Sequence, residues 1–301
     1  MQNHDPAAHD RAPAPVLGDV VDALERLWPT STAAEWDQVG LVTGDLTQPV
    51  RRVLFALDPT LAVIEEARAW DADLLVTHHP LLLRGVHSVA TTSAKGASVT
   101  GLVRAGCALY VAHTNADVAQ PGVNDALADA CGLTATEPLA VVEGQPLGRV
   151  GTLAEPVPLV DFVTGLAGAL PPAAGGLRVA GPADAPVRRV AVMGGAGDDM
   201  FDHVRRSGAD VYVTADLRHH PVLEAREEAR GGPPYLVDAG HWATESLWLG
   251  AAARRVVEAL DPGATQSPRV ETHISTLRTD PWDFVVGAEA PTPAPGLGGT
   301  S

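Results

Sequence analysis

The stretch RRVLFALDPTLAVIEEARAWDADLLVT, residues 51–77, has a second copy further along the chain, RRVAVMGGAGDDMFDHVRRSGADVYVT at residues 188–214. The two copies align without a gap, so that Asp73 falls on Asp210. Each copy reads as a short apolar strand, a turn, a helix and a second apolar strand, which is the pattern of a βαβ unit with parallel strands. The repeat therefore predicts an α/β protein built from two similar halves.

Each copy leads into one further apolar run, CALYVAHTNAD in the first half and PYLVDAGHWATE in the second. Both runs end in a histidine that an acid follows four residues later, which pairs His113 with Asp117 and His241 with Glu245. A histidine and an acid at this spacing share one face at the start of a helix, so each pair can chelate one cation.

The repeat and the composition of the linking segments define the expected domains. We expect a first α/β half at residues 16–145 and a second at 146–285, with Gly- and Pro-rich joints that include residues 144–158. Residues 1–15 are polar, and the tail at 286–301 is rich in Pro and Gly, so both are expected to be disordered.

Composition and charge exclude several classes of protein. The net charge of −16 disfavours binding to nucleic acid or to an anionic membrane, because such a surface repels phosphates. No apolar run approaches the 18 residues of a membrane-spanning helix, and the N-terminus lacks a signal-peptide core. Two cysteines are too few for a disulfide framework or a thiolate zinc site. We therefore expect a cytoplasmic protein.

Histidines and acids follow the apolar strands, where open parallel sheets bind their ligands. Imidazole and carboxylate ligands without thiolates suit Zn, Fe, Mn, Co or Ni. Two such divalent cations, ~3.5–4 Å apart, can share a hydroxide and polarise a substrate oxygen. The candidate ligands of this dinuclear site are His78, His79, His113, Asp117, His241 and Glu245.

Each candidate also has a structural interpretation. A single histidine at a strand end is usually a hydrogen-bonded structural residue, and Asp117 or Glu245 alone could stabilise a helix dipole. The recurrence of the pattern after three strands favours a metal site. In TADLRHHP, residues 214–221, Asp216, His219 and His220 are donors that position the metal ligands, substrate contacts, or members of a polar loop, and the sequence leaves these interpretations open.

Five motifs, taken together and in order, resemble the YbgI-like or Nif-three-like dinuclear-metal proteins, which are labelled GTP cyclohydrolase 1 type 2 homologues. The resemblance spans residues 16–285. The motifs are EWDQVGL at 35–41, THHPLLL at 77–83, AHTNADVAQPGVND at 112–125, TADLRHH at 214–220 and GHWATE at 240–245.

The resemblance implies two similar α/β domains with the metal cleft between them, and six subunits arranged as a trimer of dimers. It also implies two cations per subunit and a role for each ligand. His78 and Asp117 would hold one ion, His79 and His241 the other, and Glu245 would bridge them, with His113 a further ligand or a neighbour of the ligands.

The expected function is that of a metal-dependent hydrolase in which a metal-bridging hydroxide is the nucleophile. The cyclohydrolase label suggests hydrolytic opening of the guanine ring of GTP, and hydrolysis of a phosphoester or an amide-like bond is the other version of the reaction. Asp216 and His219 are the first candidates for catalytic contacts to the substrate. The alternative is a ring-shaped protein without enzymatic activity that binds or handles metal, or serves as a platform for partners.

Overall fold

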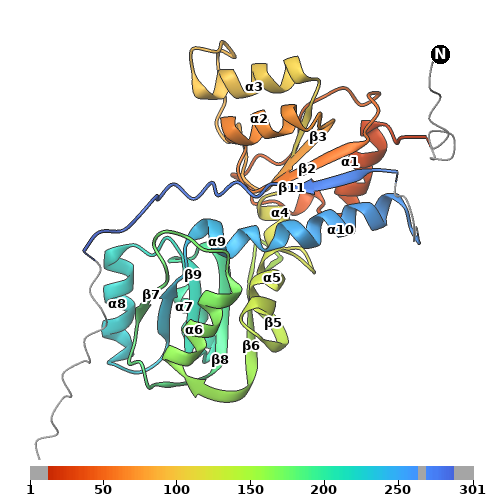
Figure 1. Ribbon diagram of the computed structural model, residues 1–301. Helices are drawn as coiled ribbons and strands as arrows, with labels where there is room; N and C mark the ends of the chain where they lie inside the picture. The colour runs from red at the N-terminus through yellow and green to blue at the C-terminus, as the bar shows by residue number, and fades with distance from the viewer. Residues whose placement is uncertain (1–12, 264–268, 288–301) are drawn as a thin grey trace, which may run out of the picture. The chain divides into compact units, whose positions relative to one another are not determined.

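The computed structural model describes residues 13–263 and 269–287, and the chain in it divides into two compact units (Figure 1). The expected disordered ends lie almost entirely outside the described residues. Each unit is assembled from three separate stretches of the chain, whereas each expected half is one continuous stretch. The first unit comprises Met1–Ala126, Val141–Leu147 and Glu245–Thr279, and the second comprises Leu127–Ala140, Gly148–Thr244 and Asp280–Ser301.

The first unit is built on a five-stranded sheet in the order β1-β4-β3-β2-β11. Strands β2, β3, β4 and β11 are parallel, and β1 runs antiparallel to β4 at one edge. The residues of β3 and β4 are all buried, as expected for strands covered on both faces. The strands are β1 (Gly40–Thr43), β2 (Arg52–Ala56), β3 (Leu74–Thr77), β4 (Ala108–Val111) and β11 (Glu271–Ile274).

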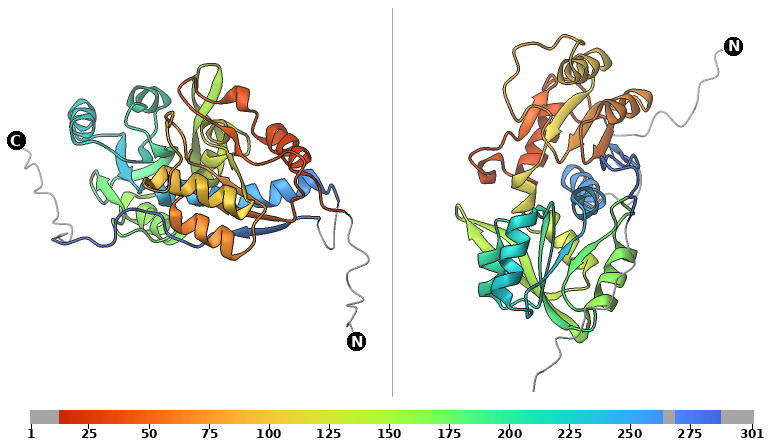
Figure 2. Two further views of the ribbon diagram at one scale, coloured as in Figure 1. Left: turned by 90° about the horizontal axis from the view of Figure 1, so that it is seen from above. Right: turned by 90° about the vertical axis from the view of Figure 1, so that its left-hand side faces the viewer.

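Helices cover both faces of this sheet. Helices α2 (Leu61–Ala69) and α3 (Ala94–Ala105) pack against each other on one face, and α1 (Leu17–Leu27) and α10 (Trp248–Leu260) pair on the other (Figure 2). A side-chain hydroxyl caps the N-terminus of α2 and of α3: Thr60 accepts from Val63 N, and Ser93 accepts from Gly96 N. On the opposite face, the buried rings of Trp28 and Trp248 meet edge to face, with centroids 5.1 Å apart.

The second unit holds a six-stranded sheet in the order β5-β6-β8-β9-β10-β7. Strands β8, β9 and β10 are parallel, while β6 and β7 run antiparallel to their neighbours β8 and β10. Figure 2 shows α7 and α8 on one face and α6 on the other. The elements are β5 (Thr134–Val142), β6 (Gln145–Pro158), α6 (Leu159–Ala169), β7 (Arg178–Ala180), β8 (Pro186–Ala196), α7 (Phe201–Ser207), β9 (Val211–Ala215), α8 (His219–Ala229) and β10 (Tyr235–Asp238).

Short helices complete the fold at the ends of strands. Two of them carry predicted ligands: α4 (Thr114–Asp117) follows β4, and α9 (His241–Ser246) follows β10. The 3-10 helix η2 (Thr30–Thr32) and helix α5 (Val123–Ala130) complete the assignment. In the part of the chain that the structure describes, no helix combines the length and the apolar character needed to cross a membrane.

One hydrogen-bond motif occurs in both copies of the sequence repeat. Asp73 Oδ2 accepts from the backbone N–H groups of Arg51 and Arg52 at 2.6 and 2.9 Å. Asp210 Oδ2 accepts from Arg188 and Arg189 in the same way, at 2.9 and 2.8 Å. In both units this carboxylate ties the start of the second strand to the start of the first. The predicted α/β class is confirmed, and the repeat corresponds to β2-α2-β3 and β8-α7-β9.

Two features differ from the sequence-based expectation. The parallel βαβ cores are extended by antiparallel strands, so both sheets are mixed. Residues 144–158, expected as a joint, form β6 almost throughout. The prolines misled the prediction: Pro146 and Pro158 lie at the ends of the strand, and Pro156 lies where its pairing with β8 shifts register. Proline cannot donate a ladder hydrogen bond and is therefore tolerated at the ends of strands and at irregularities in their pairing.

The repeated carboxylate makes a test of the fold. Replacing Asp210 by alanine leaves the N–H groups of Arg188 and Arg189 without this acceptor, and we expect the free energy of unfolding to fall by about 1–3 kcal/mol. Urea denaturation followed by circular dichroism measures the change. Asp184→Ala, at an exposed turn of the same unit, is the control. Equal stability of the two variants would show that the hydrogen bonds of Asp210 do not stabilise the fold.

Candidate metal centre

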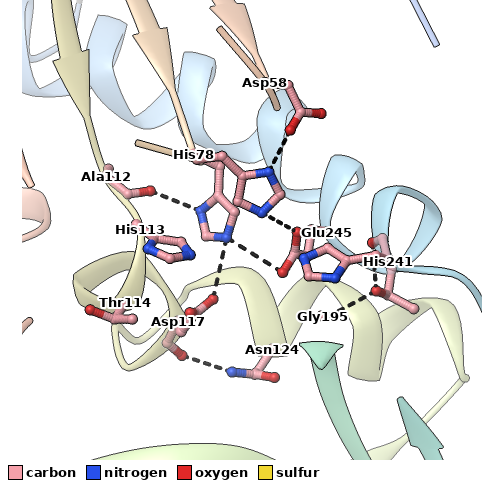
Figure 3. Close-up of polar contacts among 12 residues, drawn as sticks. Asp58, His78, Ala112, His113, Thr114, Asp117, Asn124, Gly195, His241 and Glu245 are labelled. Atoms are coloured by element: carbon pink, nitrogen blue, oxygen red, sulfur yellow. Dashed lines mark hydrogen bonds and ion pairs between the residues drawn. The ribbon is translucent and has the colours of Figure 1, made fainter. Parts of the chain in front are cut away.

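Three histidines and two acids of the first unit meet beyond the carboxyl ends of β3 and β4 (Figure 3). His78 and His79 directly follow the last residue of β3. His113 and Asp117 belong to the turn and the short helix α4 after β4, and Glu245 is carried by α9. Because β3 and β4 are parallel neighbours, their ends lie at the same edge of the sheet.

Each of the three imidazoles has its Nδ1 bound to an acceptor. His78 Nδ1 donates to the carbonyl oxygen of Ala112 at 2.8 Å, and His79 Nδ1 donates to Asp58 Oδ1 at 2.7 Å. His113 Nδ1 donates to Asp37 Oδ1 at 3.0 Å. Without a cation, His79 carries a proton on both nitrogens, because its Nε2 also lies 3.0 Å from Glu245 Oε2. A carbonyl or a carboxylate can only accept, so Nδ1 of each ring carries a proton, and the lone pair of the neutral ring is on Nε2. This is the tautomer that binds a metal through Nε2.

The potential ligand atoms of the three rings face a shared space. One potential ligand atom from each of the three histidines lies within 4.8 Å of the other two. Glu245 directs one oxygen to each of the adjacent histidines: Oε1 lies 3.6 Å from His78 Nε2, and Oε2 lies 3.0 Å from His79 Nε2. Asp117 Oδ1 lies 3.7 Å from His78 Nε2.

Two of these atoms are buried without a hydrogen bond. His78 is fully buried, and neither its Nε2 nor Asp117 Oδ1 has a hydrogen-bond partner among the described residues. Buried polar atoms are nearly always satisfied, so such a pair needs an explanation. Ligand atoms around one tetrahedral cation, with bonds of ~2.0–2.2 Å, stand roughly 3.4 Å apart. The observed separations near His78 suit a cation better than a direct hydrogen bond.

The electrostatics of the cluster are those of crowded acids. Burial, and then the charge of Glu245, raise the pKa of Asp117 to about 7. Burial alone would lower the pKa of His79, but hydrogen bonds with Asp58 and Glu245 raise it to about 9. Asp58 and Asp37 keep lowered pKa values despite burial, because His79 and His113 donate to them. A cation at the shared space would compensate the negative charge of the buried acids.

The remaining predicted site residues lie in the second unit. His241 begins α9, and its Nδ1 donates to Asp216 Oδ2 at 2.7 Å, so it shows the same anchoring as the other three histidines. Asp216 adopts a left-handed backbone conformation with φ of 54°. His219 lies at the start of α8, where it lines a pocket, and its ring packs edge to face on that of His220.

Sequence reasoning missed the acceptors that orient the histidines. Asp58 follows β2, the neighbour of β3, so its place at the end of a parallel strand was a usable signal. Asp37 lies within the EWDQVGL motif, and besides His113 it accepts from the backbone and hydroxyl of Thr114. Asp216, for which both a positioning role and a substrate contact were considered, is the acceptor for His241.

The cysteines take no part in the centre. Cys107 and Cys131 are both free and buried. Burial raises the pKa of each thiol to about 12, so neither is a thiolate near neutral pH. The donor set at the centre therefore consists of imidazole nitrogens and carboxylate oxygens.

Comparison with known proteins gives consistent results. The family model Duf34/NIF3 (NGG1p interacting factor 3) matches residues 15–281. A GTP cyclohydrolase 1 type 2 homolog of Streptomyces coelicolor is 48% identical, over 92% of this chain and 97% of that protein. A homolog with the same name from Mycobacterium tuberculosis is 34% identical, over 89% of this chain and 97% of that protein. The crystal structure of a Bacillus cereus protein related to NIF3 superposes with a TM-score of 0.81 at 26% identity, covering 91% of this chain and 100% of that one.

The anchoring carboxylate at Asp58 can be tested apart from the ligands. An Asp58→Asn variant keeps the size of the side chain but weakens the charge-assisted hydrogen bond that orients His79, and we expect zinc affinity to fall about 10- to 100-fold. Competition with a fluorescent zinc chelator measures the affinity. Asp45→Asn, an exposed change in the same unit, is the control. An unchanged affinity in the Asp58 variant would refute the positioning role.

Proposed function

Because the chain belongs to the Duf34/NIF3 family, we propose that it is a metal-dependent hydrolase with two divalent cations per subunit. In this proposal His78 and Asp117 bind one ion, His79 and His241 bind the other, and Glu245 bridges the two. His113 is a further ligand beside them. Zn, Fe, Mn, Co and Ni all suit this set of imidazoles and carboxylates.

The observation that carries the proposal is the common orientation of the histidines. His78, His79, His113 and His241 all donate from Nδ1 to a fixed acceptor, which leaves Nε2 of each neutral ring as the lone-pair nitrogen. The bridging role of Glu245 is supported by its two oxygens, which face different imidazoles at 3.6 and 3.0 Å.

Divalent cations in such a site lower the pKa of water and polarise an oxygen of the substrate. The protein's own residues perform the other tasks. Asp58 and Asp37 fix the rings of His79 and His113 by hydrogen bonds. The buried indole of Trp248 packs against the ring of His78, with ring centroids 5.5 Å apart, and also contacts the buried ring of Trp28.

The substrate class that we test first is the one named by the relatives. Opening of the guanine ring of GTP is a hydrolysis, in which water adds and a carbon–nitrogen bond breaks. The described part of the chain contains no glycine-rich phosphate loop. The glycine-rich turn that precedes α7 carries Asp198, which pairs with Arg218. Phosphoesters and amides therefore belong in the same screen.

One observation favours the alternative of a metal-handling protein without hydrolase activity. His78 is fully buried, and Glu245 is buried as well. Enclosure of the ligands favours retention of a bound metal, which a metal-handling protein requires.

Metal content and turnover measured together decide between the two functions. We expect about two transition-metal ions per chain in the purified protein by mass spectrometry of the elements. His79→Ala and Glu245→Gln should each lower this content sharply, and Glu65→Gln, on the exposed side of α2, should not. An unchanged metal content in both site variants would refute the assignment.

The same proteins are then assayed for hydrolysis of GTP, phosphoesters and amides. Turnover that is present in the wild type and in Glu65→Gln, and absent in Glu245→Gln, supports the hydrolase. Metal binding without turnover of any substrate supports the metal-handling alternative. Turnover that persists in Glu245→Gln places the activity elsewhere.

We also propose that the chain assembles as a homohexamer, a trimer of dimers. Support comes from an apolar C-terminal segment, in which the side chains of Trp282, Phe284, Val285 and Val286 are 53–83% exposed. Large apolar groups gathered in one exposed segment mark a surface for association. Light scattering during size-exclusion chromatography should give six times the mass of the chain. A monomeric mass would contradict the proposal.

A further inference from the structure

A pocket of about 340 Å³ lies in the second unit between helix α8 and strands β7 and β10. We infer that this space, called here the α8 pocket, binds a small organic anion with an apolar body. It is separate from the proposed metal ligands. Its lining residues are Arg178, Val179, Ala180, Leu217, His219, Val222, Leu223, Arg226, Leu236 and Asp238.

The helix wall of the α8 pocket has a regular pattern. His219, Val222, Leu223 and Arg226 stand at the first, fourth, fifth and eighth positions of one stretch of α8, so they occupy one helix face. Two apolar side chains lie in the middle of that face, with a basic residue at each end. Most such faces are buried against their sheet, yet Leu223 is 49% exposed.

The sheet wall repeats the same division between apolar and polar groups. Strand β7 pairs antiparallel with β10, which places Ala180 opposite Leu236 and Arg178 opposite Asp238. Residues two apart in a strand share a face, so the apolar pair and the charged pair line the same side. Leu236 is almost fully buried and forms an apolar floor. The body of a ligand would rest on this floor, against Val222 and Leu223.

The charge of the pocket is opposite to that of the chain. Arg178, Arg226 and the ionisable His219 line it, and Asp238 is the one acid among the lining residues. Asp238 is already engaged, because it accepts from Leu217 N at 3.1 Å and Gly240 N at 3.3 Å and pairs with Arg178. In a chain of net charge −16, a pocket with two arginines is a local site for an anion.

Arg226 is held in place without a carboxylate. Its Nη1 donates to the carbonyl oxygens of Gly232 and Pro234 at 2.8 and 2.6 Å, and the guanidinium packs over the ring of Tyr235. Among the described residues no acid pairs with it, and burial lowers its pKa. A fixed, partly buried guanidinium with uncompensated charge is a strong partner for a carboxylate or a sulfonate.

The size of the pocket limits the ligand. Pockets for small molecules usually span about 300–1,000 Å³, so the α8 pocket lies at the lower end of this range. It suits a medium-chain carboxylate or an aromatic sulfonate. One polar end would contact the arginines, and the remainder would cover the exposed apolar face of α8.

The binding test uses 1-anilinonaphthalene-8-sulfonate, an apolar fluorescent anion, with the full-length protein. We expect saturable binding at one site per chain, with displacement by octanoate and not by octylammonium. The charge of the competitor is decisive, because the acidic surface of the chain attracts a cation everywhere except at this pocket. Displacement by both competitors to the same extent would overturn the inference.

Matched variants place the binding at the α8 pocket. Leu223→Asp should weaken binding about tenfold or more, whereas Leu61→Asp should leave it unchanged. Both leucines lie on helices and are 49% exposed. Equal affinity in these two variants would overturn the inference.

A second pair of variants tests the charge without touching an apolar residue. Arg178→Gln should lower the affinity several-fold, and Arg218→Gln should not. Their side chains are 71% and 73% exposed, and each is paired with one aspartate, so neither change threatens folding. Loss of affinity in Arg178→Gln alone supports an anion site, and equal effects in both variants contradict it.

Discussion

An imidazole has two nitrogens, and this protein fixes one of them in each histidine of the proposed centre. The carbonyl of Ala112 and the carboxylates of Asp58 and Asp37 determine the proton position on three rings of the first unit. Asp117 and Glu245 lie on the opposite side of the rings, 3.0–3.7 Å from Nε2 of His78 and His79. Without these acceptors the rings could rotate or exchange tautomers, and their ligand nitrogens would no longer face the same space.

The fold supplies these acceptors because parallel strands end together. Asp58 follows β2, the two adjacent histidines follow β3, and His113 follows β4, and these three strands are neighbours in one sheet. The strands are apolar and buried, so they fix the position of this sheet edge, and the turns that follow them carry the polar groups. In the second unit an acid after one parallel strand also anchors a histidine after its neighbour, since Asp216 follows β9 and accepts from His241 after β10. The repeat does not place these acids at equivalent positions, because Asp58 falls on Gly195 and His79 falls on Asp216.

The sequence predicted the βαβ cores well because they depend on local pattern. The ungapped repeat placed Asp73 and Asp210 at equivalent positions, and both make the same pair of backbone hydrogen bonds. The antiparallel additions were not predictable in this way, since β6 contains three prolines and pairs with a distant strand. Asp37 and Asp58 were missed for a similar reason: each contacts its histidine across a long separation in sequence.

In the second unit, one carboxylate serves two neighbouring features. Asp238 accepts from Leu217 N and from Gly240 N, and these residues adjoin Asp216 and His241 respectively. The same carboxylate pairs with Arg178 at the rim of the α8 pocket. An anion in that pocket would compete with Asp238 for the guanidinium and leave the carboxylate to its two backbone donors alone. A carboxylate released from an arginine is a stronger acceptor for N–H groups. The hydrogen bonds from Leu217 N and Gly240 N to Asp238 would therefore strengthen when the pocket is occupied, and these bonds hold the loops that carry Asp216 and His241.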